Sequence, residues 1–285
     1  MAKNSTTFDR RKRLLSLLYE RPGVRVAEMS QLLDVSEGTI RNDLNALAAG
    51  RQLTRVRGGA TIIDDTQPRH PGFATRAKIN ADAKQCIARR AAELIQNGAS
   101  VLLDASTTVY HLARFLQDRR NLTVVTNGIE VGRALAQNLS NTVILLGGVL
   151  DPDGISIRCS LSEPLLQDLH SGMAFVSCSG FSLDAGLTEV NIHEAQLKSK
   201  MIASAGSVVA LVDSTKFGKV DLTAFVRMDQ VSHIFTDSGV SPYWIEQLKQ
   251  INAILTICNE NSVQTFTPPG KDKKGELSGG AGRHE

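Results

Sequence analysis

Apolar residues return at helical spacing in three stretches near the start of the chain. The pattern predicts helices over about residues 9–19 and 27–33, and a third that begins at Ser36. Each helix has one apolar stripe: Leu14, Leu17 and Leu18, then Met29, Leu32 and Leu33, then Ile40, Leu44 and Leu47. These stripes predict the core of a small N-terminal domain over residues 1–63.

The third helix has a polar face opposite its apolar stripe. This face carries Gly38, Arg41, Asn42 and Asn45. Arginine and asparagine pair bidentately with guanine and adenine edges in the DNA major groove, and Gly38 would let the helix start approach the duplex closely. Asp43 lies toward the apolar stripe and is expected to be a structural acceptor, because a carboxylate that faced phosphates would repel them. The pattern predicts a DNA-reading helix.

An arginine-bearing hairpin follows this helix. Polar and apolar residues alternate from Leu53 to Arg57, and Gly58 and Gly59 supply the positive φ that a tight turn needs. Arg55 and Arg57 could reach phosphates or the minor groove. A solvated surface would also explain the arginines, but helix order, cap and hairpin agree with each other and favour DNA binding. The expected DNA contacts are Ser36, Gly38, Thr39, Arg41, Asn42, Asn45, Arg55 and Arg57.

From residue 81 onward, short apolar runs alternate with helical stretches. The runs cover residues 101–103, 122–125, 143–146, 174–176, 208–212, 234–235 and 254–257. The helical stretches cover about residues 83–96, 109–117, 129–137, 194–204 and 242–250. Short apolar runs without polar alternation, separated by helices, predict a mostly parallel sheet that helices cover on both faces.

Small polar residues follow several of these runs. Since ligands bind at the carboxyl ends of the strands in such sheets, these residues are the expected ligand site. They are Asp104, Ser106, Thr107, Thr108, Thr126, Asn127, Gly147, Gly148 and Lys216. Hydroxyls and backbone N–H groups at a helix start can cradle a phosphate. Lys216 could add a positive charge, and Asp104 could accept hydrogen bonds from sugar hydroxyls.

Each of these residues also has a structural explanation. Ser106, Thr107 and Thr108 could cap a helix, and Asn127 could cap the next one. The glycine pair could form a turn, and Lys216 could be a solvated loop charge. Convergence of several such loops at one edge favours the ligand site, because a structural role does not require it.

Charge is divided unevenly along the chain. Residues 1–63 hold 11 Lys and Arg against 6 Asp and Glu, a net of +5, whereas the whole chain is +3. A basic N-terminal domain on a faintly acidic remainder fits binding of DNA phosphates by the N-terminal domain alone. Residues 64–80 are expected to be a linker, residues 81–267 a second domain, and residues 268–285 a disordered tail.

Four cysteines without a C-x-x-C pair argue against zinc and favour a reducing cytoplasm. We expect no metal site, no cofactor and no membrane partner, since the sequence has no apolar stretch of spanning length. These expectations leave DNA and a small ligand as the partners of the chain.

The N-terminal motifs resemble those of the DeoR family of bacterial transcription regulators. Residues 35–44 (VSEGTIRNDL) and 53–60 (LTRVRGGA) match its V-S-x-x-T-I-R-x-D-L and L-x-R-x-x-G-G-A patterns. The resemblance implies a winged helix-turn-helix. Asn42 stands where a second arginine is usual, and Arg51 where a glycine precedes the wing. The first departure could change base preference, and the second could shift the entry of the wing.

The second domain resembles the sensor domain of the same family, which is related to ribose-5-phosphate isomerase. The motifs include DASTT at residues 104–108, EAQLK at 194–198 and TKFG at 215–218. Ala105 and Ser106 replace the serine and glycine usual in the first motif. Either the loop keeps a permissive conformation and Ser106 binds the ligand, which we prefer, or the ligand class differs.

The resemblance implies a repressor of a sugar-metabolism operon that a phosphorylated sugar releases from its double-stranded DNA operator. Reading of repeated operator half-sites implies a homodimer or homotetramer. The alternative is a sugar-phosphate isomerase or deaminase with an added head, for which Asp104, Glu189, His193 and Glu194 are the candidate acids and bases. No arrangement of these four residues requires catalysis, so we expect the chain not to be an enzyme.

Overall fold

The computed structural model divides the chain into two compact units, residues 1–71 and residues 72–285. The structure describes residues 7–20, 24–49, 53–56, 59–62, 72–151, 155–158, 163–260 and 262–268. Residues 64–71 of the predicted linker, and the predicted tail from residue 269 onward, lie outside these ranges.

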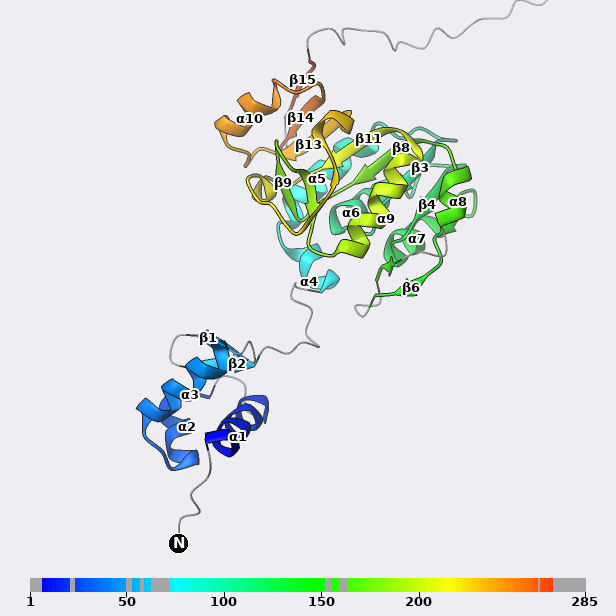
Figure 1. Ribbon diagram of the computed structural model, residues 1–285. Helices are drawn as coiled ribbons and strands as arrows, with labels where there is room; N and C mark the ends of the chain where they lie inside the picture. Colours follow the sequence, from blue (N-terminus) through cyan, green and yellow to red (C-terminus); the bar gives the residue numbers. More distant parts are fainter. Residues whose placement is uncertain are drawn as a thin grey trace, which may run out of the picture. The chain divides into compact units, whose positions relative to one another are not determined.

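The first unit contains three helices and a hairpin (Figure 1). They are α1 (Thr7–Glu20), α2 (Val26–Leu33), α3 (Glu37–Ala49), β1 (Leu53–Val56) and β2 (Gly59–Ile62). The two strands are antiparallel, and Arg25 forms an isolated bridge to Gly59 of β2. Gly59 was expected to supply a positive φ for the turn, but it lies within β2 and has no positive φ, and Gly58 lies outside the described residues. This arrangement confirms the predicted winged helix-turn-helix.

An apolar cluster joins all the elements of the first unit. It consists of Leu14, Leu18, Val24, Val26, Met29, Ile40, Leu44, Leu47, Leu53 and Ala60. The predicted stripe of α3 is therefore buried. Leu32 was expected to face inward on α2 but is 49% exposed, because Val26 and Met29 provide the buried face of this two-turn helix. The left-handed Asp34, at φ 53°, then ends α2.

An eight-stranded sheet lies at the centre of the second unit. Its strand order is β15-β14-β13-β11-β8-β3-β4-β5, and all neighbours are parallel except β14 and β15. The strands are β3 (Ser100–Leu103), β4 (Thr123–Thr126), β5 (Thr142–Leu145), β8 (Ser171–Val176), β11 (Ala205–Leu211), β13 (His233–Asp237), β14 (Ile254–Cys258) and β15 (Val263–Phe266). The mostly parallel sheet is confirmed.

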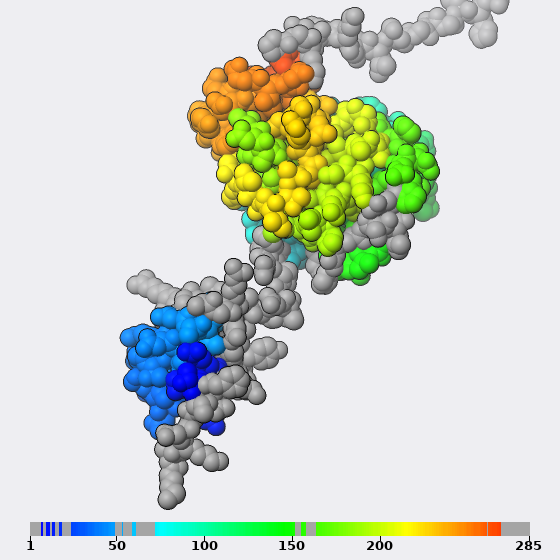
Figure 2. All heavy atoms as spheres, in the orientation of Figure 1, coloured from blue at the N-terminus to red at the C-terminus, as the bar shows by residue number. Residues whose placement is uncertain are grey.

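Helices cover both faces of this sheet. Val101 and Leu103 of β3 pack against α5 (Ala81–Ala92), α6 (Thr107–Phe115) and α7 (Ile129–Ala136). Leu102, between them, belongs to the opposite cluster, with residues of α8 (Glu163–Asp168), α9 (Ile192–Ala203) and α10 (Pro242–Leu248). Figure 2 shows this second face, with α9 in yellow-green and α10 in orange. Burial on both sides explains why the strands read as continuous apolar runs.

Short elements beside the main sheet escaped sequence prediction. Strands β9 (Gly180–Ser182), β10 (Gly186–Glu189) and β12 (Thr223–Val226) form an antiparallel sheet in the order β12-β10-β9. Strands β6 (Val149–Leu150) and β7 (Ile157–Arg158) form a second antiparallel pair, and η1 (Ser214–Lys216) and η2 (Met228–Gln230) are 3-10 turns. Two to four residues are too few to show a period.

Residues 72–80 differ from the prediction of a continuous linker. They include helix α4 (Phe73–Lys78), which belongs to the second unit and buries Phe73. The loop signals of Pro71 and Gly72 directly precede this helix, and its six residues are too few to show a helical period. None of the helices in the described residues combines the length and apolar character that a membrane span needs.

Candidate nucleic-acid interface and ligand site

The outer face of α3 presents the polar residues that were predicted to contact DNA. Gly38, Arg41, Asn42 and Asn45 are all exposed, on the side opposite the buried stripe. A Cβ placed on Gly38 would meet the Ser36 hydroxyl at 3.7 Å, which is ordinary contact. Packing within the described part of the unit therefore does not demand glycine there, whereas close approach to a duplex would favour it.

The start of α3 is capped by Ser36. Its Oγ accepts a hydrogen bond from the Thr39 amide at 3.1 Å and lies 2.9 Å from the Thr39 hydroxyl. The first turn of a helix leaves backbone N–H groups without intrahelical acceptors, and these groups attract phosphates. Ser36 and Thr39 are thus placed where a DNA backbone could bind.

The inner side of α3 is fixed by an ion-pair cluster. The buried carboxylate of Asp43 accepts hydrogen bonds from Arg10 Nε at 2.6 Å and Arg11 Nε at 2.9 Å, both on α1. Burial alone would raise the pKa of Asp43, but the two guanidinium groups outweigh it and hold that pKa below its usual value. Asp43 is the structural acceptor expected from the sequence.

Replacing Asp43 with Asn should lower the free energy of opening of α3 by about 1–2 kcal/mol at neutral pH, because two charge-assisted hydrogen bonds are lost. The folded-state pKa is depressed, so this stabilisation is present above the unfolded pKa near 3.8 and disappears as the pH falls through the folded pKa. Hydrogen exchange of α3 in the full chain against pH measures it. Asp34→Asn, at an exposed carboxylate of the same unit, is the control.

Arg41 pairs with a neighbour on its own helix. Its Nη2 lies 2.8 Å from Glu37 Oε2, and both side chains are exposed, at 59% and 45%. Exposed ion pairs of this kind contribute little to stability. Arg41 can therefore leave Glu37 and contact DNA with only a small loss of stability. Arg55 lies in β1, but its side chain is not among the described ones, and Arg57 lies outside the described residues altogether.

The loop after β3 is held in place by a buried carboxylate. Asp104 Oδ1 accepts from the Ser106 amide and Oδ2 from the Ser177 amide, each at 2.9 Å. Ser106 caps α6, and its Oγ accepts from the Val109 amide at 3.2 Å. Capping and ligand binding are compatible, since other amides of the first turn remain available. A sugar contact by Asp104 remains a prediction, because this residue is fully buried and bonded within the protein.

The structure brings the loops after β3, β4 and β8 together. The Thr108 hydroxyl is 3.5 Å from the Ser177 hydroxyl, and a Cβ on Gly128 would lie 2.9 Å from Ala105 Cα. Only glycine allows this approach between the β3 and β4 loops. The neighbouring residues Thr107, Thr108, Thr126 and Asn127 are all buried.

Asn127 has a buried oxygen without a partner. Its Nδ2 donates to the Ile157 carbonyl at 3.3 Å, while its Oδ1 has no hydrogen-bond partner among the described residues. Thr126 Oγ1, in contrast, accepts from the Gly128 amide at 3.0 Å. Buried acceptors are usually satisfied, so the Asn127 oxygen is suited to a donor on a ligand.

Lys216 lies in the loop after β11. Asp213 caps the turn through Oδ1, and Asp237 of β13 accepts from the Ser214 amide at 2.6 Å. Lys216 is half-buried, and no carboxylate of the described residues forms an ion pair with it. Gly147 and Gly148 are exposed beyond β5, which is two strands from β3 in the strand order, as β11 is on the other side.

A buried cluster of charges was not predicted as a unit. The Lys198 ammonium is fully buried and lies 3.0 Å from Asp104, 2.6 Å from Glu189 and 3.4 Å from Glu194. Burial, with the nearby carboxylates, raises the pKa of Glu189 to about 7 although Lys198 opposes the shift. The i,i+4 spacing of Glu194 and Lys198 was visible in the sequence. A fully buried lysine was not, because lysine is normally exposed.

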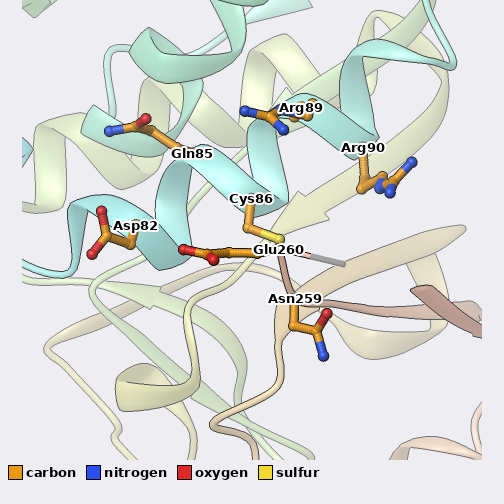
Figure 3. A pocket seen from close by; sticks show the side chains of 7 residues that line it. All are labelled: Asp82, Gln85, Cys86, Arg89, Arg90, Asn259 and Glu260. Atoms are coloured by element: carbon orange, nitrogen blue, oxygen red, sulfur yellow. The ribbon is translucent and has the colours of Figure 1, made fainter. Parts of the chain in front are cut away.

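Two cavities in the described residues lie away from these loops. One, of about 90 Å³, lies along α5, where Cys86 is beside Asn259 and Glu260 (Figure 3). The other, of about 390 Å³, lies between α8 and the end of α9. Neither is lined by a candidate residue, so the ligand assignment depends on the converging loops.

A winged helix with an exposed polar reading face, followed by an α/β domain with converging polar loops, defines a DNA-binding regulator with a sensor domain. Comparison with known families agrees. Residues 10–66 match the DeoR-like helix-turn-helix domain and residues 79–238 the DeoR C-terminal sensor domain. The chain belongs to the DeoR family of transcriptional regulators.

Curated relatives cover nearly all of the chain. The transcriptional regulator GolR of Listeria innocua is 33% identical over 234 residues, 82% of this chain and 92% of the relative. The L-fucose operon activator of Haemophilus influenzae is 34% identical over 244 residues, 86% and 97% of the two chains. A putative aga operon repressor of Escherichia coli O157:H7 is 30% identical and covers 89% and 95%. These relatives are regulators, so the enzyme alternative is not supported.

Solved structures similar to the chain include ribose 5-phosphate isomerases. The Neisseria gonorrhoeae enzyme covers 69% of this chain and 99% of its own, with 9% identity and a TM-score of 0.40. The Methanocaldococcus jannaschii enzyme covers 48% and 55%, with 17% identity and a TM-score of 0.37.

Proposed function

We propose that this regulator represses a sugar-metabolism operon and that a phosphorylated sugar, bound at the carboxyl edge of the sensor sheet, releases it from DNA. The observation that carries the proposal is the loop at the start of α6. There the Ser106 cap, buried Thr107 and Thr108, and the brace from Asp104 present a helix N-terminus to an anion. Lys216 supplies a half-buried positive charge for the same group.

The names of the relatives support the sugar part of the proposal. One is an L-fucose operon activator and another a putative aga operon repressor. Repression is the direction we assign here, with the sugar as the ligand that lowers DNA affinity. Binding must then favour one arrangement of the chain over another, because a ligand shifts an equilibrium only by its differential affinity.

We further propose that Ser36, Gly38, Thr39, Arg41, Asn42 and Asn45 contact the operator, with Arg55 and Arg57 of the wing. Helix-turn-helix proteins read repeated half-sites through symmetric copies, so a homodimer or homotetramer in the cytoplasm is the expected active form. Sedimentation of the chain, with and without DNA, determines the number of copies.

A thermal-shift screen tests the effector. Full-length protein is mixed with phosphorylated pentoses and hexoses, and with the same sugars lacking phosphate as matched controls. A sugar phosphate at one hundred times its dissociation constant should stabilise the folded state by about 2.7 kcal/mol, a rise in Tm of about 5–10 °C. Equal shifts with and without phosphate, or no shift with any sugar phosphate, would overturn the proposed site.

A further inference from the structure

Helix α4 is the first described element after the N-terminal unit in the chain, and it is fastened to α6. The Phe73 ring packs edge-on against Tyr110, with centroids 5.4 Å apart. His111 Nε2 lies 3.2 Å from the Ala77 carbonyl oxygen, near the end of α4. Tyr110 and His111 are both on α6, whose first turn is the proposed phosphate cradle. The helix that carries the proposed phosphate cradle therefore contacts α4 directly.

Lys84 of α5 binds the end of the same helix. Its buried ammonium donates hydrogen bonds to the carbonyls of Arg76, at 2.5 Å, and Ile79, at 2.8 Å. Burial lowers the pKa of Lys84 to about 8, while the charge of Asp213 opposes this shift and that of Lys216 adds to it. The charges of Asp213 and Lys216, in the loop after β11, are therefore close enough to act on the Lys84 ammonium.

Asn80 ties the turn between α4 and α5 to that loop. Its backbone is left-handed, with φ 53°. Its Nδ2 lies 3.3 Å from Asp213 Oδ1 and 3.2 Å from Thr215 Oγ1, directly before Lys216 in the chain. The second oxygen of Asp213 is buried and has no hydrogen-bond partner among the described residues. The loop that carries Lys216, the other part of the proposed ligand site, is thus connected to the turn after α4.

We propose that α4 transmits occupancy of the ligand site toward the DNA-reading unit, with Asn80, Lys84 and His111 as the positioning residues. An anion at the start of α6 attracts Lys216 and so changes the loop that holds Asn80. The contacts at the end of α4 then change on both sides, from α5 and from α6. Since the chain runs from α4 directly into the linker, this helix is the point where such a change leaves the sensor domain. The inference rests on the proposed function.

Hydrogen exchange of residues 73–80 in the full chain tests it, with inorganic phosphate as the probe and chloride at matched ionic strength as the reference. In the wild type, phosphate should change the exchange of these amides on the order of tenfold. Asn80→Gly removes the side-chain bonds yet keeps the left-handed backbone, and it should abolish this response while the phosphate-induced thermal shift remains. His111→Phe, which keeps a ring but loses the bond to Ala77, should weaken the response.

The matched control is Asn121→Gly. Asn121 is also left-handed, at φ 58°, but it precedes β4 and so lies at the amino edge of the sheet. Its variant should respond to phosphate like the wild type. A thermal shift without any change at residues 73–80 in the wild type would overturn the transmission role and leave the ligand site standing. A normal response in Asn80→Gly would also overturn it. No thermal shift with phosphate would remove the ligand site and this proposal together.

Discussion

Replacing Thr107 with Ala, or Lys216 with Ala, should abolish the response to the phosphorylated sugar while DNA binding stays intact. Each variant loses one hydrogen bond or ion pair to a charged phosphate, a contribution of about 1.5–3 kcal/mol, so effector affinity should fall about 10- to 150-fold. Thr107 is buried in the first turn of α6, and Lys216 is half-buried after β11. Both positions belong to the sensor domain, away from the reading helix in the sequence. Effector titration of the DNA complex measures the loss.

Two variants separate this result from damage to the fold. Thr107→Ser keeps the hydroxyl and should keep most of the response. Lys219→Ala removes a nearby exposed charge from the same loop and should respond like the wild type. Unchanged effector sensitivity in both Thr107→Ala and Lys216→Ala would show that the phosphate binds elsewhere.

Arg41→Ala should weaken binding to specific DNA by about 1–3 kcal/mol, which corresponds to about 5- to 150-fold in Kd. The reason is the geometry of the guanidinium group, which can donate two parallel hydrogen bonds to guanine in the major groove. The exposed pair with Glu37 positions this group in the free protein but contributes little to its stability. Binding is measured with a duplex selected by the full chain from random DNA, and in parallel with unselected DNA.

Arg41→Lys distinguishes base reading from phosphate contact. Lysine keeps the charge but cannot reproduce the planar fork, so a base-reading position should lose specificity in this variant. Equal losses on selected and unselected DNA in Arg41→Ala would identify a phosphate contact instead. The slope of log K against log salt should then fall by about one.

The first unit could be predicted almost completely from its sequence. Its helices have clear apolar stripes, Ser36 is a strong cap, and the glycine pair marks the hairpin. Local patterns decide such a structure, and the structure agrees with them. Leu32 is one exception, because it lies on a helix so short that two residues cover its buried face. Gly59 is another, because it pairs within β2 instead of supplying a positive φ to the turn.

The sensor domain was predictable in its central sheet but not at its margins. Buried parallel strands are apolar along their whole length, so the pattern is strong. Strands such as β10 and β12 are short and pair across 34 or more residues, as Thr188 does with Ala224. A pairing between distant segments leaves no local period in the sequence.

The candidate ligand site could also be predicted only in part. Sequence placed polar residues after the strands, and the structure brings Thr108 of the β3 loop to Ser177 of the β8 loop. It could not show that Asp104 would bind Lys198 from 94 positions away, or that Asn80 would reach Asp213. Such partners are determined by tertiary packing. A motif therefore identifies the loops of a site, but not the side chains that hold them.

Because Arg10 and Arg11 bind Asp43 on the inner side of α3, the residues that stabilise this helix are separate from those expected to read DNA. The side of α3 that keeps the helix in place holds Ile40, Asp43 and Leu44, and none of these residues is exposed. The reading side is exposed and contributes little to folding. Substitutions at positions 41, 42 and 45 can therefore explore new operator sequences at almost no cost in stability. Duplicated copies of such a gene could acquire separate operators without changes to the core of the DNA-binding domain.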